Sequence, residues 1–153
     1  AIVTEKGIQV LEFAPRIGGG LSYYIIKELV GFDVVEAAID SFIGKDITFC
    51  DHQLTKCYST NLLYMIPGIF DHVEGLQELK DSGIAHDIFV MKNKGAEVDS
   101  DMRSSNRVAA FILEAQSYSK LNELERKAIE SIELRDKNGK PLLNRSIYDF
   151  KTL

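Results

Sequence analysis

The chain has 153 residues, of which 45% are hydrophobic and 27% charged, a globular balance that suits one ordinary domain and excludes a disordered tail. Eighteen basic residues against 23 acidic ones give a net charge of -5 without a basic stripe, so we expect no nucleic-acid partner. The longest apolar runs, such as Leu62 to Phe70, are far shorter than the ~20 residues that cross a bilayer, so we expect no membrane contact.

The two cysteines, Cys50 and Cys57, are too few for a disulfide framework, and their spacing lacks the paired CxxC hooks of a structural zinc site. We therefore expect reduced thiols and a cytoplasmic setting. The sequence begins at Ala1 in a strand-like run, with neither an initiator Met nor a signal peptide. This start indicates a fragment of a longer protein.

The first predicted element is a β-hairpin. Ile2 to Thr4 and Ile8 to Phe13 have strand character, and they flank a polar connection that ends in Gly7. Pro15 ends the second strand, because proline cannot donate to a strand ladder. The run Gly18 to Gly20 then removes three side chains, which predicts a sharp turn or a close approach to a ligand.

Two short helices are predicted next. Apolar residues at helical spacing predict a helix from Leu21 to Val30, and Gly31 is the expected residue at its end. Asp33 can cap a second helix, which continues to Gly44. The pattern then changes from helix to strand, so the boundary between two parts of the chain is predicted near residues 44–51.

The second part is predicted to consist mainly of sheet. Its strand-like runs are Lys56 to Met65, Ile69 to Val73, Ile84 to Met91 and Arg107 to Gln116. Leu76 to Asp81 is predicted as a short helix, and Ser119 is predicted to cap a longer helix that continues to about Ile132. Residues 136–140 form a turn cluster, and residues 141–153 have no clear period, which suggests a tail that packs on a neighbour.

The segment with chemical content lies at the end of the predicted hairpin. Alternation along the strand turns Glu12 away from the core, while Leu11 and Phe13 face it. A carboxylate on a strand suits Mg²⁺, which takes its other ligands from water and phosphate. Arg16 offers a fork for a phosphate or carboxylate, and Gly18 to Gly20 let backbone N–H groups reach the same anion. The plain alternative is a surface ion pair between Glu12 and Arg16, with glycines that only form a loop.

Six short motifs carry a resemblance to a known superfamily. They are E-F-A-P-R-I-G-G-G at residues 12–20, G-F-D at 31–33, A-A-I-D at 37–40, I-P-G at 66–68, V-E-G-L at 73–76 and S-S-N-R-V at 104–108. The first three resemble the C-terminal end of an ATP-grasp catalytic domain. The others resemble the small β-rich domain that follows it in the L-amino acid ligase and biotin carboxylase-like branch; carbamoyl-phosphate synthase large chain belongs to the same superfamily.

The resemblance implies an α+β fold. Residues 1–47 would be the end of the ATP-grasp catalytic domain, and residues 48–153 would form a small β-rich domain with a packed helix. In the superfamily the motif reads E-x-N-P-R, so Glu12 would bind Mg²⁺, and Glu12 and Arg16 together would hold ATP. Arg16 would be the catalytic residue that binds phosphate or the acceptor, and Gly18, Gly19 and Gly20 would border the substrate pocket. Ala14 stands at the Asn position and cannot bind a metal ion.

The implied function is that of a fragment of an ATP-dependent ligase. Such an enzyme activates a small-molecule carboxylate as an acylphosphate, which an amine or a thiol then displaces. The nucleotide-clamping residues of the family precede the segment that corresponds to this chain, so we expect the chain to be inactive in isolation. The alternative, which Ala14 favours, is a non-catalytic ATP-grasp-derived module for binding or oligomerisation. Apolar surface exposed by a truncated domain would favour a homo-oligomer.

Other polar residues are assigned structural roles. The three histidines, His52, His72 and His86, are widely spaced and are expected to lie separately at the surface or in satisfied positions. Arg107 stands at the start of a predicted strand, where we expect a structural ion pair.

Overall fold

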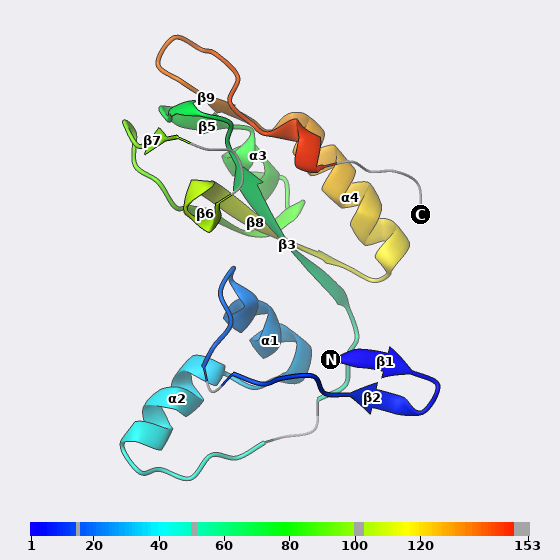
Figure 1. Ribbon diagram of the computed structural model, residues 1–153. Coiled ribbons are helices and arrows are strands. Elements are labelled where there is room, and N and C mark those ends of the chain that lie inside the picture. The colour runs from blue at the N-terminus through cyan, green and yellow to red at the C-terminus, as the bar shows by residue number, and fades with distance from the viewer. Residues whose placement is uncertain (15, 50–51, 100–102, 149–153) are drawn as a thin grey trace. The chain divides into compact units, whose positions relative to one another are not determined.

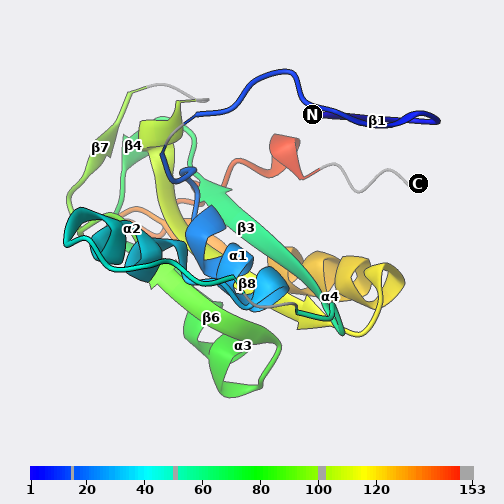
Figure 2. The same ribbon diagram turned by 90° about the horizontal axis from the view of Figure 1, so that it is seen from below.

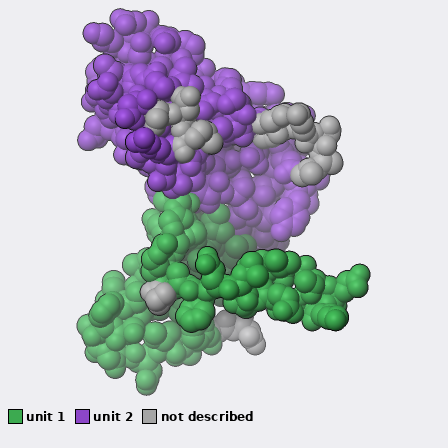
Figure 3. All heavy atoms as spheres, viewed as in Figure 1, with its two compact units in different colours: residues 1–52 green, residues 53–153 purple. Residues whose placement is uncertain are grey.

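The computed structural model describes residues 1–14, 16–49, 52–99 and 103–148. The chain divides into two compact units, residues 1–52 and residues 53–153, which Figure 3 shows in green and purple. Each unit is described by itself below. Among the residues that the structure describes, no helix has the length and apolar character needed to cross a membrane.

Unit 1 begins with the predicted hairpin (Figure 1). Strands β1 (Ile2–Thr4) and β2 (Gly7–Gln9) pair antiparallel, with Ile2 opposite Gln9. The prediction that the second strand continues to Phe13 is wrong, because residues 10–14 lie outside any strand. Leu11 and Phe13 are 68% and 88% exposed instead of buried. A ribbon of two three-residue strands has no face wide enough to bury such side chains.

Both helices predicted for unit 1 are confirmed. Helix α1 (Ser22–Val30) ends at Gly31, which has a left-handed φ of 65° and donates its N–H to the Lys27 carbonyl at 2.9 Å. Helix α2 (Val34–Phe42) begins at Asp33, whose carboxylate accepts two N–H groups of the first turn at 3.0 Å each. The N–H of Glu36, together with the ammonium group of Lys27 and the N–H of Val35, holds the pKa of Asp33 below its usual value.

Unit 2 is built around a three-stranded antiparallel sheet with the order β3–β8–β6. The strands are β3 (Cys57–Tyr64), β6 (Ala85–Val90) and β8 (Arg107–Ala115). The central strand β8 is the longest, and its Phe111 lies opposite Asn61 of β3 and Ile88 of β6. The run of apolar residues predicted as a strand from Arg107 therefore forms the middle of the sheet.

Shorter elements surround this sheet. They are β4 (Gly68–Ile69), β5 (His72–Glu74), α3 (Leu76–Asp81), β7 (Glu97–Val98), a 3-10 turn (Ser104–Asn106), α4 (Tyr118–Ser131), β9 (Glu133–Arg135) and a second 3-10 turn (Arg145–Ile147). Strand β4 pairs with β7, and β5 pairs with β9. Helix α4 lies along β8 and β3, and α3 lies beside β6 (Figure 2).

The sequence analysis did not predict β7, β9 or the two 3-10 turns, and two of the predictions that it made are wrong. The predicted strand from Ile69 to Val73 is divided into β4 and β5, with two residues between them. The cap of α4 is Ser117 and not Ser119: the Ser117 hydroxyl accepts the N–H of Lys120 at 3.2 Å. Ser117 has the extended backbone of a cap residue, with φ of -154° and ψ of 156°, whereas Ser119 already belongs to the first turn.

One apolar core joins the sheet of unit 2 to α3, α4 and the chain that follows β9. Its most buried large side chains include Leu63, Met65, Val108, Phe111, Ile132, Leu134 and Leu142, each at most 1% exposed. At Gly75 the backbone before α3 lies close to the backbone at the end of α4: a Cβ atom on Gly75 would lie 2.2 Å from the Ser131 carbonyl oxygen. The start of α3 therefore contacts the end of α4 directly through backbone.

The segment predicted as an aperiodic tail belongs to the core of unit 2. Leu142 donates its N–H to the Leu134 carbonyl at 2.8 Å and accepts the N–H of Ile66 at 2.9 Å. The Tyr148 hydroxyl donates to the Leu62 carbonyl of β3 at 2.7 Å. Residues 141–148 thus pack on their own unit and not on a neighbour, while residues 149–153 lie outside the described residues.

We expect Tyr148→Phe to lower the free energy of unfolding of unit 2 by about 1–2 kcal/mol, since it leaves the Leu62 carbonyl without its donor.

Burial raises the pKa of Tyr148 to about 12. Between pH 10 and pH 12 the unfolded chain has lost this proton and the folded chain keeps it, so stability falls as pH rises. Urea unfolding at pH 9 and pH 11 measures both effects. An equal loss of stability with pH in Tyr148→Phe would contradict the assignment to Tyr148.

Candidate functional site

The predicted site residues lie on the connection between β2 and α1. Glu12 is exposed and makes no hydrogen bond or ion pair with another described residue. Arg16 donates its backbone N–H to the Ala14 carbonyl at 2.8 Å and one side-chain N–H to the Ile17 carbonyl at 3.5 Å. These two described residues, Glu12 and Arg16, do not pair with each other. Both charged groups therefore remain available to an external ligand.

The glycine run turns the backbone into α1 through two left-handed residues. Gly20 has a φ of 72° and Leu21 a φ of 65°, and Leu21 is the residue at the start of the helix. A left-handed conformation costs a side-chain-bearing residue of order 1–3 kcal/mol, and such strain is concentrated at functional sites. Leu21 has no side chain that could accept the first N–H groups of α1. Those donors, at the positive end of the helix dipole, favour an anion.

Ser22 adds a polar atom to this turn that the sequence motif did not identify. Its Oγ atom is buried and has no hydrogen-bond partner among the residues that the structure describes. A Cβ atom on Gly18 would lie 2.7 Å from this oxygen, whereas one on Gly19 would meet no atom within 4 Å. A side chain at position 18 would therefore make the Ser22 hydroxyl turn away, and Gly19 leaves open space beside the loop.

Magnesium fits this segment only as part of a larger ligand set. Glu12 offers one carboxylate, and the methyl group of Ala14 offers no oxygen. Within residues 1–14, 16–49, 52–99 and 103–148, no three His, Cys, Asp or Glu side chains are gathered for a metal ion. Mg²⁺ commonly takes one or two carboxylates and completes its octahedron with water and phosphate. Glu12 can therefore supply one ligand of such a set.

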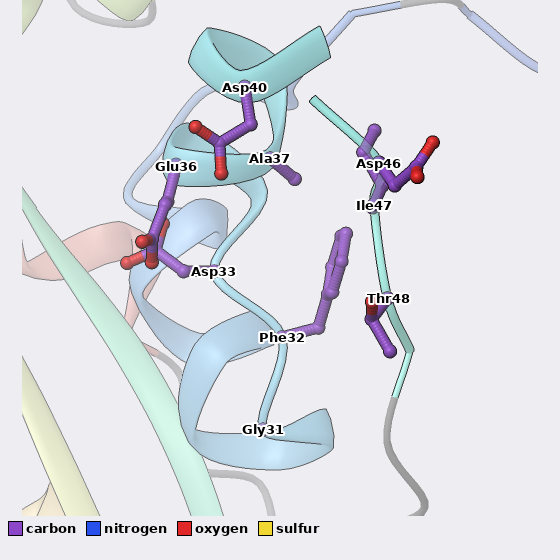
Figure 4. A pocket seen from close by; sticks show the side chains of 9 residues that line it. All are labelled: Gly31, Phe32, Asp33, Glu36, Ala37, Asp40, Asp46, Ile47 and Thr48. Carbon is purple, nitrogen blue, oxygen red and sulfur yellow. The ribbon is translucent and has the colours of Figure 1, made fainter. Parts of the chain in front are cut away.

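An acidic pocket of unit 1, with a volume of about 180 Å³, was not predicted (Figure 4). Asp33, Glu36 and Asp40 line it from the α2 side, and Asp46 lines it from the segment that follows α2. Two of these carboxylates already have cationic partners at 2.9 Å, since Asp33 pairs with Lys27 and Asp40 pairs with Lys45. The recurrence of acidic residues at positions 33, 36 and 40 was the available signal. The pairing gives Asp33 and Asp40 a structural role.

The histidines have separate surroundings, as predicted. His72 lies 3.0 Å from Asp71 and 3.4 Å from Glu74, and His86 lies 3.8 Å from Glu114. His52 is exposed and its ring borders Gly31. The Cys57 thiol is free, and Cys50 lies outside the described residues.

Arg107 makes no ion pair with any carboxylate that the structure describes, although its position suggested one. Its Nε atom donates to the Tyr64 hydroxyl at 2.7 Å, and the guanidinium carbon lies 5.6 Å from the centre of the Tyr64 ring. The prediction was wrong because the partner is set by the register of β3 and β8, which places Tyr64 opposite Arg107. A register of this kind cannot be read from either segment alone.

Comparison with known proteins identifies the fold. No family model and no curated protein sequence matches the chain. Among solved structures, L-amino acid ligase from Bacillus licheniformis is 20% identical with a TM-score of 0.69, over 80% of this chain and 31% of that one. Phosphoribosylglycinamide synthetase from Anaerococcus prevotii is 14% identical with a TM-score of 0.72, over 89% and 35%.

The chain thus spans about a third of the length of either enzyme. Both are ATP-grasp enzymes, and at this level of identity the likeness is one of fold. The predicted mixture of helix and sheet is confirmed. The chain is therefore similar in fold to part of these two ATP-grasp enzymes, as the resemblance of the sequence motifs implied.

Proposed function

We propose that the chain is part of an ATP-dependent ligase that joins a carboxylate to an amine or a thiol. In this proposal residues 1–47 complete the catalytic domain and residues 48–153 form the domain that follows it. The observation that supports it is the turn from Arg16 through Gly18 to Gly20, which leads to the uncapped start of α1 and offers several donors to an anion. The fold shared with two ATP-grasp ligases supplies the context.

The chemistry has two displacement steps. An oxygen of the substrate carboxylate attacks the γ-phosphorus of ATP, and ADP leaves. The amine or thiol then attacks the acyl carbon, inorganic phosphate leaves, and the nucleophile gives its proton to solvent. Neither step needs a nucleophile from the protein; both depend on positioning and on neutralisation of charge.

Each residue of the turn has a place in these steps. Arg16 would hold the transferred phosphoryl group or the acceptor carboxylate through its planar fork. The N–H groups of Gly18 to Gly20 and of the first turn of α1 would bind the same anion. Glu12 would contribute one ligand to Mg²⁺, which when bound neutralises the negative charge of the phosphates.

We propose that the 153-residue chain by itself neither hydrolyses ATP nor binds it tightly. Among the described residues no three His, Cys, Asp or Glu side chains are gathered for a metal ion, and the chain corresponds to about a third of either enzyme. The free thiol of Cys57 agrees with a cytoplasmic location. Micromolar binding of ATP by the isolated chain, measured by calorimetry, would contradict this part of the proposal.

Ala14 favours a second function, a non-catalytic module for binding or oligomerisation, because it removes a metal ligand from the motif. Unit 1 also exposes apolar side chains that could serve such a role, including Phe13 at 88% and Phe42 at 93%. A module of this kind would not depend on Glu12 or Arg16 for its activity.

An assay of the complete parent protein separates the two functions. We expect ADP release that is stimulated by one of a panel of amino acids or by bicarbonate, and we expect Glu12→Gln and Arg16→Ala each to lower it by about 100-fold or more. Gly19→Ala meets no described atom, so it should fold normally and still lower activity if the substrate approaches this loop.

Two substitutions at exposed charges serve as controls. Glu5→Gln changes an exposed carboxylate in the hairpin turn, and Arg126→Ala removes an exposed guanidinium on α4. Both should retain full activity. If ADP release is absent, or is indifferent to Glu12 and Arg16, the ligase proposal fails and the module is favoured.

A further inference from the structure

Unit 2 contains an unusual arginine at one end of its central strand. Arg107 is the first residue of β8 and lies opposite Tyr64, the last residue of β3. The pairing shifts between Leu63 and Tyr64, so that Arg107 and Val108 together oppose one residue of β3. Such β-bulges redirect side chains and are frequent beside binding sites.

The guanidinium of Arg107 is held in place from one side. Its Nε atom donates to the Tyr64 hydroxyl at 2.7 Å, and its carbon lies over the Tyr64 ring at 5.6 Å. These two contacts orient the planar group. Its terminal nitrogens, Nη1 and Nη2, have no acceptor within the part of the chain that the structure describes, and no carboxylate there pairs with them.

Two other arginines of unit 2 donate hydrogen bonds both to a carboxylate and to backbone carbonyls. Arg135 donates to Glu74 at 2.9 Å and to the Gly139 carbonyl at 3.1 Å. Arg145 donates to two backbone carbonyls, at 3.0 Å and 2.8 Å, and to Glu133 at 3.2 Å. Both therefore have a carboxylate partner, whereas Arg107 is half-buried with a single neutral acceptor.

A half-buried cation that lacks a counter-charge has lost hydration without a compensating partner. The Tyr64 hydroxyl accepts the bond from Arg107, so its own proton is free to donate, and no described residue accepts it. The site therefore presents donors only. Parallel donors at Nη1 and Nη2 match the two oxygens of a carboxylate or a phosphate.

We propose that Arg107 and Tyr64 bind an oxyanion, a carboxylate or a phosphate group of a small molecule, on unit 2. The guanidinium of Arg107 donates hydrogen bonds to two oxygens of the anion, and the Tyr64 hydroxyl donates a hydrogen bond to the same group. The proposed site uses no residue of the Arg16 turn, and it does not depend on the proposed ligase activity.

The test uses the ¹⁵N-labelled 153-residue chain and follows the Nε–H resonances of its arginines by NMR. Inorganic phosphate and acetate are added in separate titrations, and sodium chloride at matched ionic strength is the reference. We expect a saturable shift of the Arg107 resonance with at least one of the two anions. The anion with the lower dissociation constant identifies the group that the site prefers.

Three substitutions make the result specific. Arg107→Lys keeps the charge but loses the fork, so we expect affinity to fall about 10-fold or more. Tyr64→Phe keeps the ring and removes the hydroxyl, so we expect a fall of about 3-fold to 10-fold. Arg126→Gln removes an exposed guanidinium on α4 and should change nothing. The backbone amide spectrum checks that each variant is folded.

Two results would overturn the proposal. One is an Arg107 resonance that moves no further with phosphate or acetate than with chloride. The other is unchanged affinity in a folded Arg107→Lys chain, which would assign Arg107 a packing role only. Because the titration needs no nucleotide, its failure would leave the ligase proposal untouched, and the ADP-release assay tests that proposal separately.

Discussion

Gly75→Ala should destabilise unit 2 by about 3–5 kcal/mol, which is enough to leave a marginal domain largely unfolded. The added Cβ atom would lie 2.2 Å from the Ser131 carbonyl oxygen and 3.0 Å from its carbonyl carbon. Both atoms belong to backbone and cannot turn aside. Gly75 also has a φ of 81°, a conformation that alanine adopts only with strain.

Gly83→Ala is the matched control for this prediction. Gly83 has a similar φ of 72°, but a Cβ atom there would meet nothing within 4 Å. Gly83→Ala should therefore lower the free energy of unfolding only by the backbone strain, about 1 kcal/mol. Urea unfolding followed by circular dichroism gives both values. Equal losses in the two variants would show that the contact between the start of α3 and the end of α4 is not as close as described.

Phe111→Ala should lower the free energy of unfolding of unit 2 by about 3–5 kcal/mol. Phe111 lies on the central strand, is 0% exposed and packs in the core shared by the sheet and α4. Because β8 is paired on both sides, the sheet cannot easily collapse into the cavity that the substitution leaves.

Phe42→Ala provides the same chemical change at a position that is 93% exposed. Its effect should remain within about 0.5 kcal/mol, as for most surface substitutions. Chemical unfolding of both variants measures the difference. If Phe42→Ala were as costly as Phe111→Ala, the Phe42 ring would have to be buried in solution, and sedimentation would show whether a second copy covers it.

The elements that the sequence predicted correctly are those with local signals. Gly31 ends α1 through its own left-handed backbone, and Asp33 begins α2 through its own carboxylate. Strand β8 is marked by a continuous apolar run, because both of its faces are covered. Each of these signals acts within a few residues of the chain.

The errors come from structure that depends on distant residues. The alternating run at residues 10–14 has the sequence of a strand, but a strand also needs a partner. Residues 141–148 lack any period, because their backbone bonds go to several different strands. The pairing of Tyr64 with Arg107 joins residues 43 positions apart and depends on register.

In the candidate site, too, the residues with a local sequence signal were predicted, and those that depend on the path of the backbone were not. Glu12, Arg16 and the three glycines were predicted from a contiguous motif, and the structure places them on one connection without testing their roles. The motif could not indicate the strained Leu21 or the buried Ser22 hydroxyl, because both follow from how the turn enters α1. Only a backbone path shows which polar atoms are left without partners.

The hydrogen bond between Tyr148 and Leu62 joins residues 86 positions apart, so the first long strand of unit 2 is completed by the last described residue. During synthesis on a ribosome, β3 is made before its partner β8 and before the final segment. The apolar residues of β3 therefore stay uncovered until β8, and then the final segment, have been made. This delay makes the nascent chain of unit 2, and any copy that terminates early, a natural target for chaperones and proteases.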